Sequence, residues 1–314
     1  MSARTKKSNP WIFFICSSIA IVVSTLGTIY FFRESIPSRI GLVLIGSPTV
    51  VVSYDQSRKT LFAVSIPSDV QVDMVRGYGT YPISSLWTLD VLDKRRGVVL
   101  TESFEEVIGF PVRYFIHAPN KNNEPQDIHE RINASLTYSV LIQSLFQKNK
   151  TNIPFIPLFE LIQTYRGMST TDMKFIDLSE ENVFVRMTLP DGNVIKKIDG
   201  EKIAFLFGTY TEDAEIRKEN FRLAVYNSTT TAGLAQKITR ILEKLGFHVS
   251  VIANDDSSKP SYCVVKSKKD IQNSVSVKTL RWLYRCVFEE ETQTTQTDIS
   301  LIIGTEYEKR FLPF

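Results

Sequence analysis

The residues of this chain best suited to chemistry follow a short apolar segment in its first third. Ser65-Ile66-Pro67-Ser68-Asp69 ends that segment with two hydroxyls and a carboxylate. A transferase or hydrolase could use the carboxylates and guanidinium groups found here and downstream: Asp69, Asp73, Arg76, Arg95, Arg96 and Arg131. For each of them the alternative is a solvated surface charge. We take Asp69, Arg76 and Arg131 as a candidate residual polar site.

Three β-strands are predicted to position the carboxylate of Asp69. The sequence from Leu42 to Asp69 reads as strand, break at Gly46-Ser47-Pro48, strand 49–54, turn 55–59 and strand 60–66. β-Branched and aromatic residues fill the runs, and turn-forming residues bound them. Three successive valines at 50–52 favour a strand covered on both faces.

The pattern downstream predicts alternating helices and strands. We expect a loop or tight turn at 77–82, helices near 86–92 and 97–108 with a left-handed cap at Gly109, and a strand at 110–116. A polar loop at 118–127 and one helix over 128–147 follow, with Ile132, Leu136, Val140, Leu141 and Leu145 on a shared face of the helix. We then expect a break at Pro154 and Pro157, a helix over 158–165, a short element capped near 170–172 and a hairpin from 183 to 198. A charged segment at 209–220 suggests a domain boundary.

The last hundred residues predict a small β-α-β-β-α-β unit. Its strands are expected at 221–226, 249–253, 262–266 and 299–303, and its helices at 232–245 and 277–288, with Gly246 ending the first helix and an acidic loop at 289–297.

Composition excludes some classes of protein. With 314 residues and 43% hydrophobic content, the chain has enough apolar material for real cores. A net charge of +3 without a basic stripe interleaved with aromatics argues against nucleic-acid binding. Three scattered histidines form no metal motif. The two glycines at 77 and 79 lack the lysine and third glycine of a phosphate-binding loop.

An uncharged stretch of 22 residues, Trp11–Phe32, is long enough to cross a bilayer as a helix. Basic residues precede it and favour a cytoplasmic N-terminus, which would place the rest of the chain outside the cytoplasm. A cleaved signal peptide is the alternative, but the apolar run is long for one and no clear cleavage site follows. We expect an uncleaved anchor whose partner is the lipid bilayer.

Two of the three cysteines, Cys263 and Cys286, lie far downstream of the apolar stretch. We interpret them as small buried hydrophobic residues, the first in a strand and the second in a helix. A disulfide between them remains an alternative that the sequence does not decide.

The C-terminal third resembles the LytR C-terminal domain. The resemblance rests on RLAVYNSTTTAGLAQKITRILEKLGFHVSVIAN and ISLIIGTEY, with a strand ending before N-S-T, a G-L-A helix start and a G-F-x-V exit. It implies a binding or scaffolding role at the cell envelope and no catalytic residues.

Residues 39–120 resemble the first half of the LytR-CpsA-Psr (LCP) domain, on VVVSYDQSRKTLFAVSIPSD and ESFEEVIGFPVRYFI. This family implies an extracytoplasmic phosphotransferase that moves glycopolymers from a polyprenyl-pyrophosphate lipid onto peptidoglycan with Mg²⁺. Arginines would neutralise the pyrophosphate and carboxylates would hold the metal. The resemblance completes the expected α/β fold: a transmembrane anchor (1–35), an LCP-like domain with a central mixed sheet (36–215) and a LytR-type domain (216–314).

The chain departs from the family pattern at the positions that carry the chemistry. The family pattern R-S-D-T falls on Gly46-Ser47-Pro48-Thr49 in this chain. At the family pattern S-I-P-R-D this chain keeps Asp69 but has Ser68 in place of the arginine, and of the later R-x-x-R-Q pattern only Arg131 remains. We therefore expect a non-catalytic pseudoenzyme in the cell membrane that binds envelope glycan or other envelope proteins, with no catalytic residue, metal or cofactor. In that case Asp69 would cap a turn or pair with Arg76. The alternative is an active Mg²⁺-dependent phosphotransferase. A lipid-sized apolar groove beside Asp69 would favour substrate binding, and a filled core would argue against it.

Overall fold

The computed structural model describes residues 38–117, 127–146, 150–189, 192–255, 259–292 and 296–311. The predicted anchor, Trp11–Phe32, and the polar loop up to residue 126 lie outside these ranges. Within them, no helix is both long enough and apolar enough to span a membrane. Pro37–Phe314 forms one compact unit.

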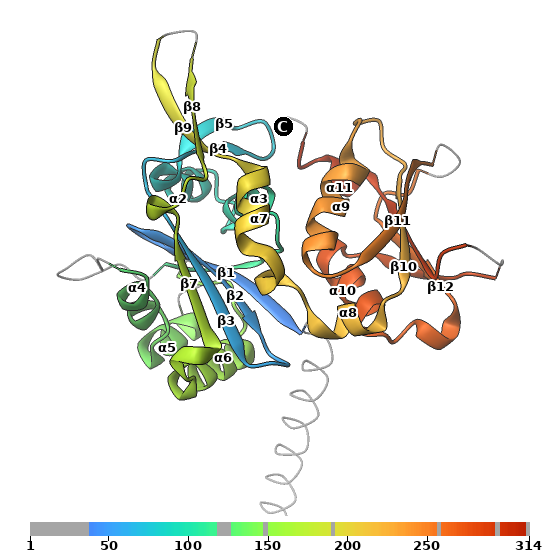
Figure 1. Ribbon diagram of the computed structural model, residues 1–314, viewed down its shortest axis with the longest axis horizontal. Helices are drawn as coiled ribbons and strands as arrows, with labels where there is room; N and C mark the ends of the chain where they lie inside the picture. The colour runs from blue at the N-terminus through green and yellow to red at the C-terminus, as the bar shows by residue number, and fades with distance from the viewer. Residues whose placement is uncertain are drawn as a thin grey trace, which may run out of the picture. The chain divides into compact units, whose positions relative to one another are not determined.

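The first sheet is mixed, as predicted, with strand order β6-β1-β2-β3-β7. Figure 1 shows β1, β2, β3 and β7 of this sheet next to one another. Its three central strands are antiparallel, whereas β6 runs parallel to β1 and β7 runs parallel to β3. The bounds are β1 Arg39–Ile45, β2 Thr49–Asp55, β3 Thr60–Ile66, β6 Tyr114–His117 and β7 Met173–Asp177. The prediction for β1 to β3 is confirmed, whereas the sequence pattern did not reveal β7.

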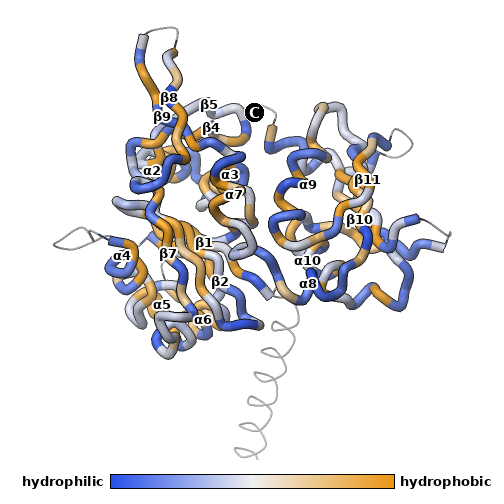
Figure 2. Tube along the Cα trace, in the orientation of Figure 1, coloured by the Kyte–Doolittle hydropathy of each residue, from blue (hydrophilic) through white to orange (hydrophobic). Residues whose placement is uncertain are grey.

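The valine run lies at the centre of this sheet. Val50, Val51 and Val52 have no exposed surface, so both faces of β2 are covered, as the unbroken apolar run predicts. Figure 2 shows the central strands as a band of hydrophobic colour. One face packs against a core that includes Phe62, Phe104 and Phe115.

A smaller sheet with order β5-β4-β9-β8 stands beside the first. Its strands are β4 Gln71–Met74, β5 Gly79–Pro82, β8 Phe184–Thr188 and β9 Val194–Ile198. The β8–β9 hairpin confirms the prediction. The prediction of a loop or tight turn at 77–82 is confirmed at Gly77, which lies in the turn between β4 and β5 with a positive φ. It is wrong for 79–82, because these residues form β5 and pair with β4.

Helices α2 (Ile83–Leu92) and α3 (Val98–Ile108) confirm the predicted helix pair. Gly109 ends α3 in the left-handed conformation, as predicted. The N-terminus of α3 has no cap from its own preceding residue. Instead the buried Asp90 of α2 accepts hydrogen bonds from the backbone N–H groups of Val99 and Leu100 at 3.1 and 3.3 Å.

The single helix predicted over 128–147 is wrong. The chain forms α4 (Ile128–Ser135) and α5 (Tyr138–Phe146), and the backbone leaves the helical conformation at Leu136. Leu136 itself is buried. After this break Leu145 no longer shares a face with the buried residues, and its exposed fraction is 55%.

The proline at 157 does not break the next helix, contrary to the prediction. Helix α6 spans Phe155–Gly167 and contains Pro157 in its first turn. A backbone N–H in the first turn has no partner within the helix, so a proline there costs no hydrogen bond. A short 3-10 turn, η1 (Thr170–Asp172), then leads into β7. The connections beyond are η2 Leu178–Glu180, α7 Gly200–Phe207, η3 Gly208–Thr211 and α8 Ala214–Glu219.

The C-terminal segment forms a third sheet with order β11-β10-β14-β12-β13. Its elements are β10 Arg222–Asn227, α9 Leu234–Lys244, β11 His248–Asn254, β12 Val264–Ser267, η4 Lys269–Ile271, α10 Val275–Tyr284, β13 Val287–Glu290, β14 Ile299–Ile303 and α11 Thr305–Glu308. The predicted strand and helix order is present. The second helix ends earlier than predicted, because Arg285 turns left-handed and β13 follows where a helix end and a loop were expected.

Cys263 and Cys286 form a disulfide, with their Cα atoms 4.5 Å apart. The interpretation of two unpaired buried cysteines is therefore wrong. Cys286 lies after α10 rather than within it, and this early helix end brings it beside the start of β12. Disulfides are rare in the cytosol and common outside it.

A buried ion-pair network joins the C-terminal residues to α3. The guanidinium of Arg310 lies 2.7 Å from a carboxylate oxygen of Glu105 and 3.3 Å from one of Glu102. Burial opposes ionisation of Arg310, but the carboxylates outweigh this and raise its pKa. Tyr307 donates a hydrogen bond of 3.2 Å to Glu106, also of α3.

Candidate binding site

The structure separates the three residues of the predicted polar site. Asp69 lies in the exposed turn after β3, and Lys196 is 3.8 Å from its carboxylate. Arg76 forms two hydrogen bonds to Glu102, at 2.9 and 3.2 Å. The predicted pairing of Asp69 with Arg76 is therefore wrong, since each has a different counterion.

The other candidate residues of the transferase or hydrolase hypothesis are not brought together around one site by any described contact. Asp73, on β4, accepts hydrogen bonds of 2.7 and 2.8 Å from Lys197. Burial opposes its ionisation, yet the hydrogen bonds from Lys197 and Thr80 outweigh this and lower its pKa. Arg95 and Arg96 lie in the loop between α2 and α3.

Arg131 is the one predicted arginine that reaches the β1–β2 break. It is buried in α4, and its guanidinium donates a hydrogen bond of 2.7 Å to the backbone oxygen of Ser47. A Cβ atom on Gly46 would lie 2.2 Å from its Nη1 atom. Arg131 thus occupies the space that a side chain at position 46 would need.

A small pocket opens beside this arginine, with a volume of about 240 Å³. Ser47, Thr49, Ser68 and Ser84 contribute hydroxyl groups to it. The rest of its described lining is Gly46, His117 and apolar side chains, among them Trp87 and Phe104 of α2 and α3. Pockets for small molecules usually have about 300–1,000 Å³. The space beside Ser68 is therefore small for a lipid chain.

His117 is the titratable group of this pocket, and sequence reasoning did not select it. Its ring lies 4.8 Å from that of Trp87. Burial, with the positive charges of Lys150 and Arg131, lowers its pKa below the usual 6.5. A neutral imidazole near hydroxyl groups can accept or donate a hydrogen bond. Only the pairing of His117 with Ile45 across β6 and β1 reveals its position, and no local sequence motif encodes it.

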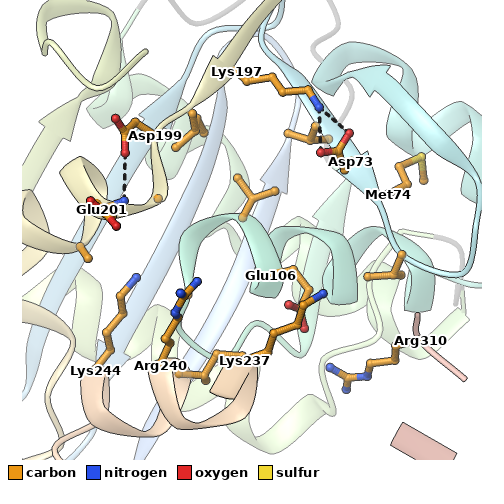
Figure 3. Close-up of a pocket in the computed structure, with 18 of the residues that line it drawn as sticks. Asp73, Met74, Glu106, Lys197, Asp199, Glu201, Lys237, Arg240, Lys244 and Arg310 are labelled. Carbon is orange, nitrogen blue, oxygen red and sulfur yellow. Dashed lines mark hydrogen bonds and ion pairs between the residues drawn. The ribbon is translucent and has the colours of Figure 1, made fainter. Parts of the chain in front are cut away.

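A second, larger cavity of about 1,200 Å³ lies between α3, α7, α9 and the β4–β5 hairpin. Figure 3 shows Lys237, Arg240 and Lys244 projecting from α9 toward it. The ammonium group of Lys244 donates a hydrogen bond of 3.1 Å to the backbone oxygen of Ile108, at the end of α3. Burial and the neighbouring Arg240 lower the pKa of Lys244 to about 8.

The acidic wall of this cavity includes Glu106 on α3. Burial and the neighbouring Glu105 raise its pKa, although Arg310 and Lys237 act in the opposite direction. Charges of both signs line the cavity, and Lys197 and Asp73 pair with each other. Within the described ranges, no group of three or more His, Cys, Asp or Glu residues is arranged to hold a metal ion.

Comparison with known proteins decides the nature of the C-terminal segment. Residues 220–307 match the family model described as LytR cell envelope-related transcriptional attenuator. This segment is a LytR-type C-terminal domain. The resemblance noted from its N-S-T, G-L-A and G-F-x-V motifs is therefore confirmed. No curated protein sequence matches the chain.

Several solved structures align with about half of the chain. The transcriptional regulator yvhJ from Bacillus subtilis aligns at 14% identity and a TM-score of 0.37, covering 55% of this chain and 94% of its own. The LytR-CPS2A-psr family protein YwtF (TagT) with bound octaprenyl pyrophosphate lipid aligns at 15% identity and a TM-score of 0.35, covering 54% and 87%. Bacillus subtilis TagU aligns at 11% identity and a TM-score of 0.36, covering 54% of this chain and 94% of its own. TM-scores this low do not place individual site residues.

Proposed function

We propose that this protein is anchored in the cell membrane and acts outside the cytoplasm in envelope assembly, where it binds or scaffolds cell-wall glycopolymer without catalysing its transfer. Residues 36–215 would form its degenerate LCP-like domain and residues 216–314 its LytR-type domain. The apolar run Trp11–Phe32 supports the anchor. The Cys263–Cys286 disulfide supports an oxidising, extracytoplasmic location.

The lining of the small pocket is the observation that carries the non-catalytic role. Transfer of a phosphoryl group needs cations or metal ions that stabilise its developing negative charge. The described residues that line the pocket are apolar or carry hydroxyl groups, apart from His117 and Gly46. The nearby guanidinium of Arg131 is directed to the backbone oxygen of Ser47. This set suits hydrogen bonding to a ligand better than neutralising a pyrophosphate.

An active phosphotransferase is the second candidate. Arg131 reaches the loop where the LCP pattern has an arginine, and Asp69 follows Ser68 at the rim of the pocket. Magnesium-dependent transfer that requires Asp69 would establish this alternative.

Retention on purified cell walls tests the binding role. The full chain in detergent should sediment with insoluble peptidoglycan that carries its glycopolymer, and it should be retained less by peptidoglycan stripped of that polymer. Equal retention on both materials, or none, would contradict the proposal. A C-terminal reporter that is active only in the cytoplasm would contradict the topology.

A further inference from the structure

Helices α5 and α6 expose a group of large apolar side chains that the proposed function does not use. We call them the α5–α6 patch: Ile142, Leu145, Phe146, Phe155 and Phe159. Phe146 has an exposed fraction of 81%. The rings of Phe155 and Phe159 are parallel to within 6°, with centroids 6.5 Å apart. Grouped exposed apolar side chains of this kind are typical of interaction surfaces.

Contacts between the two helices bring the α5 and α6 parts of the patch together. Gln163 of α6 donates a hydrogen bond of 2.8 Å to the hydroxyl of Tyr138 in α5, and Arg166 lies 4.3 Å from the ring centroid of that tyrosine. Positions three or four apart share a helix face, which gives one row in each helix. The rows are Tyr138, Ile142 and Leu145 in α5, and Phe155, Phe159 and Gln163 in α6. One end of the α5 row meets one end of the α6 row at Tyr138 and Gln163, and the two helices pack against each other.

The patch lies at the end of the first sheet where the described chain begins. Asn152, just before α6, donates a hydrogen bond of 3.0 Å to the backbone oxygen of Arg113, just before β6. After α6 the chain enters β7 at Met173, which pairs with Leu61 at the start of β3. The strand pairings place the start of β6 and the start of β7 at the same end of the sheet, the end that holds Arg39. Helix α6 therefore crosses that end, as Figure 1 shows.

The chain outside the described ranges limits how far this end can lie from a membrane. Five residues, 33–37, separate the apolar run Trp11–Phe32 from Ser38. The six residue steps from Phe32 to Ser38 span at most about 22 Å when fully extended. If the run is an anchor, as the proposed function holds, this end of the sheet stays near the bilayer surface.

We propose that the α5–α6 patch docks on the outer leaflet of the bilayer that holds the anchor, with its apolar side chains among the upper acyl chains. Phenylalanine, leucine and isoleucine partition into this boundary. Tyr138 and Arg166 at one end of the patch suit the headgroup level, where aromatic rings and cations are favoured. Docking would hold the first sheet at a fixed height above the membrane.

Tryptophan fluorescence in proteoliposomes tests the docking. The full chain is reconstituted in phosphatidylcholine–phosphatidylglycerol vesicles, with and without brominated acyl chains that quench nearby indoles. Phe146→Trp is compared with Phe205→Trp, a matched control on α7, where the phenylalanine has an exposed fraction of 91%. Each signal is taken as the difference from the parent chain.

The added indole at 146 should lose fluorescence in brominated vesicles, and the one at 205 should keep it. Reconstitution at one protein per nanodisc should preserve the quenching, because no second copy is needed. Equal quenching at both positions, or loss of the effect in single-copy nanodiscs, would overturn the docking. Loss of quenching when Trp11 of the parent chain is replaced by phenylalanine reports the anchor separately from Trp87 and Trp282, so failure of the anchor and failure of the patch are distinguishable.

Discussion

Replacement of Arg310 by methionine should strongly destabilise the packing of the C-terminal residues on α3. The arginine side chain is 7% exposed and contacts two carboxylates, at 2.7 and 3.3 Å. Removing one partner of a buried ion pair costs about 3–5 kcal/mol, because a charge is left unpaired. Arg76 and Arg113 remain near Glu102 and Glu105, respectively, so we expect the lower value, about 3 kcal/mol.

Urea unfolding of a chain starting at residue 37 measures this cost. With a slope of about 3 kcal/mol per molar urea, the midpoint should fall by about 1 M. Lys309→Met is the matched control, since the neighbouring Lys309 is exposed and its pair with Glu306 should contribute less than about 1 kcal/mol.

A variant that neutralises Glu105 together with Arg310 tests the reasoning further. Glu105→Gln and Arg310→Met combined should recover part of the lost stability, because the most buried carboxylate no longer lacks its partner and Glu102 keeps its pair with Arg76. If Arg310→Met costs no more than Lys309→Met, the network is solvated and the argument fails.

Three further changes test other contacts. Gly46→Ala should lower the free energy of unfolding in urea by about 1–3 kcal/mol, since its Cβ displaces Arg131. This loss of stability should be smaller in an Arg131→Met background, and an equal loss in both backgrounds would refute the contact. His117 has a lowered pKa, so the unfolded chain binds more protons below pH 6.5 and stability should fall as pH drops. Thermal unfolding from about pH 7 to about pH 5 should show a smaller fall in His117→Gln, whereas equal falls would mean that the imidazole is solvated. Cys263→Ser should lower the unfolding free energy by about 3 kcal/mol for a loop of 23 residues, and no loss after reduction of the parent would contradict the disulfide.

The sequence predicted the elements whose signals are local. The valine run at 50–52, the turn at 55–59 and the cap at Gly109 depend on a few neighbouring residues, and the structure has a strand, a turn and a helix end there. The break between α4 and α5 carries no glycine or proline, so helix periodicity alone predicted one continuous helix across it. That error hid the α5–α6 patch, because Leu145 had been assigned to a buried face.

The site depends on contacts between residues far apart in the chain. Arg131 reaches Ser47 across 84 positions, and Arg310 reaches Glu105 across 205. Sequence comparison identified Arg131 as a surviving arginine but could not place its guanidinium against Gly46. It also gave no indication that Arg76 would pair with Glu102 instead of Asp69. Such pairings follow from the order of the strands, which the pattern of apolar residues leaves open.

A single-turnover transfer assay tests the central claim, that this LCP-like fold binds envelope glycan without transferring it. The full chain in proteoliposomes is mixed with Mg²⁺, peptidoglycan and a radiolabelled glycopolymer on polyprenyl pyrophosphate. The protein is in molar excess over the labelled glycopolymer. We predict binding of the labelled glycan with no Mg²⁺-dependent label on peptidoglycan, and the same result for Asp69→Ala. Mg²⁺-dependent transfer that Asp69→Ala abolishes would contradict the account.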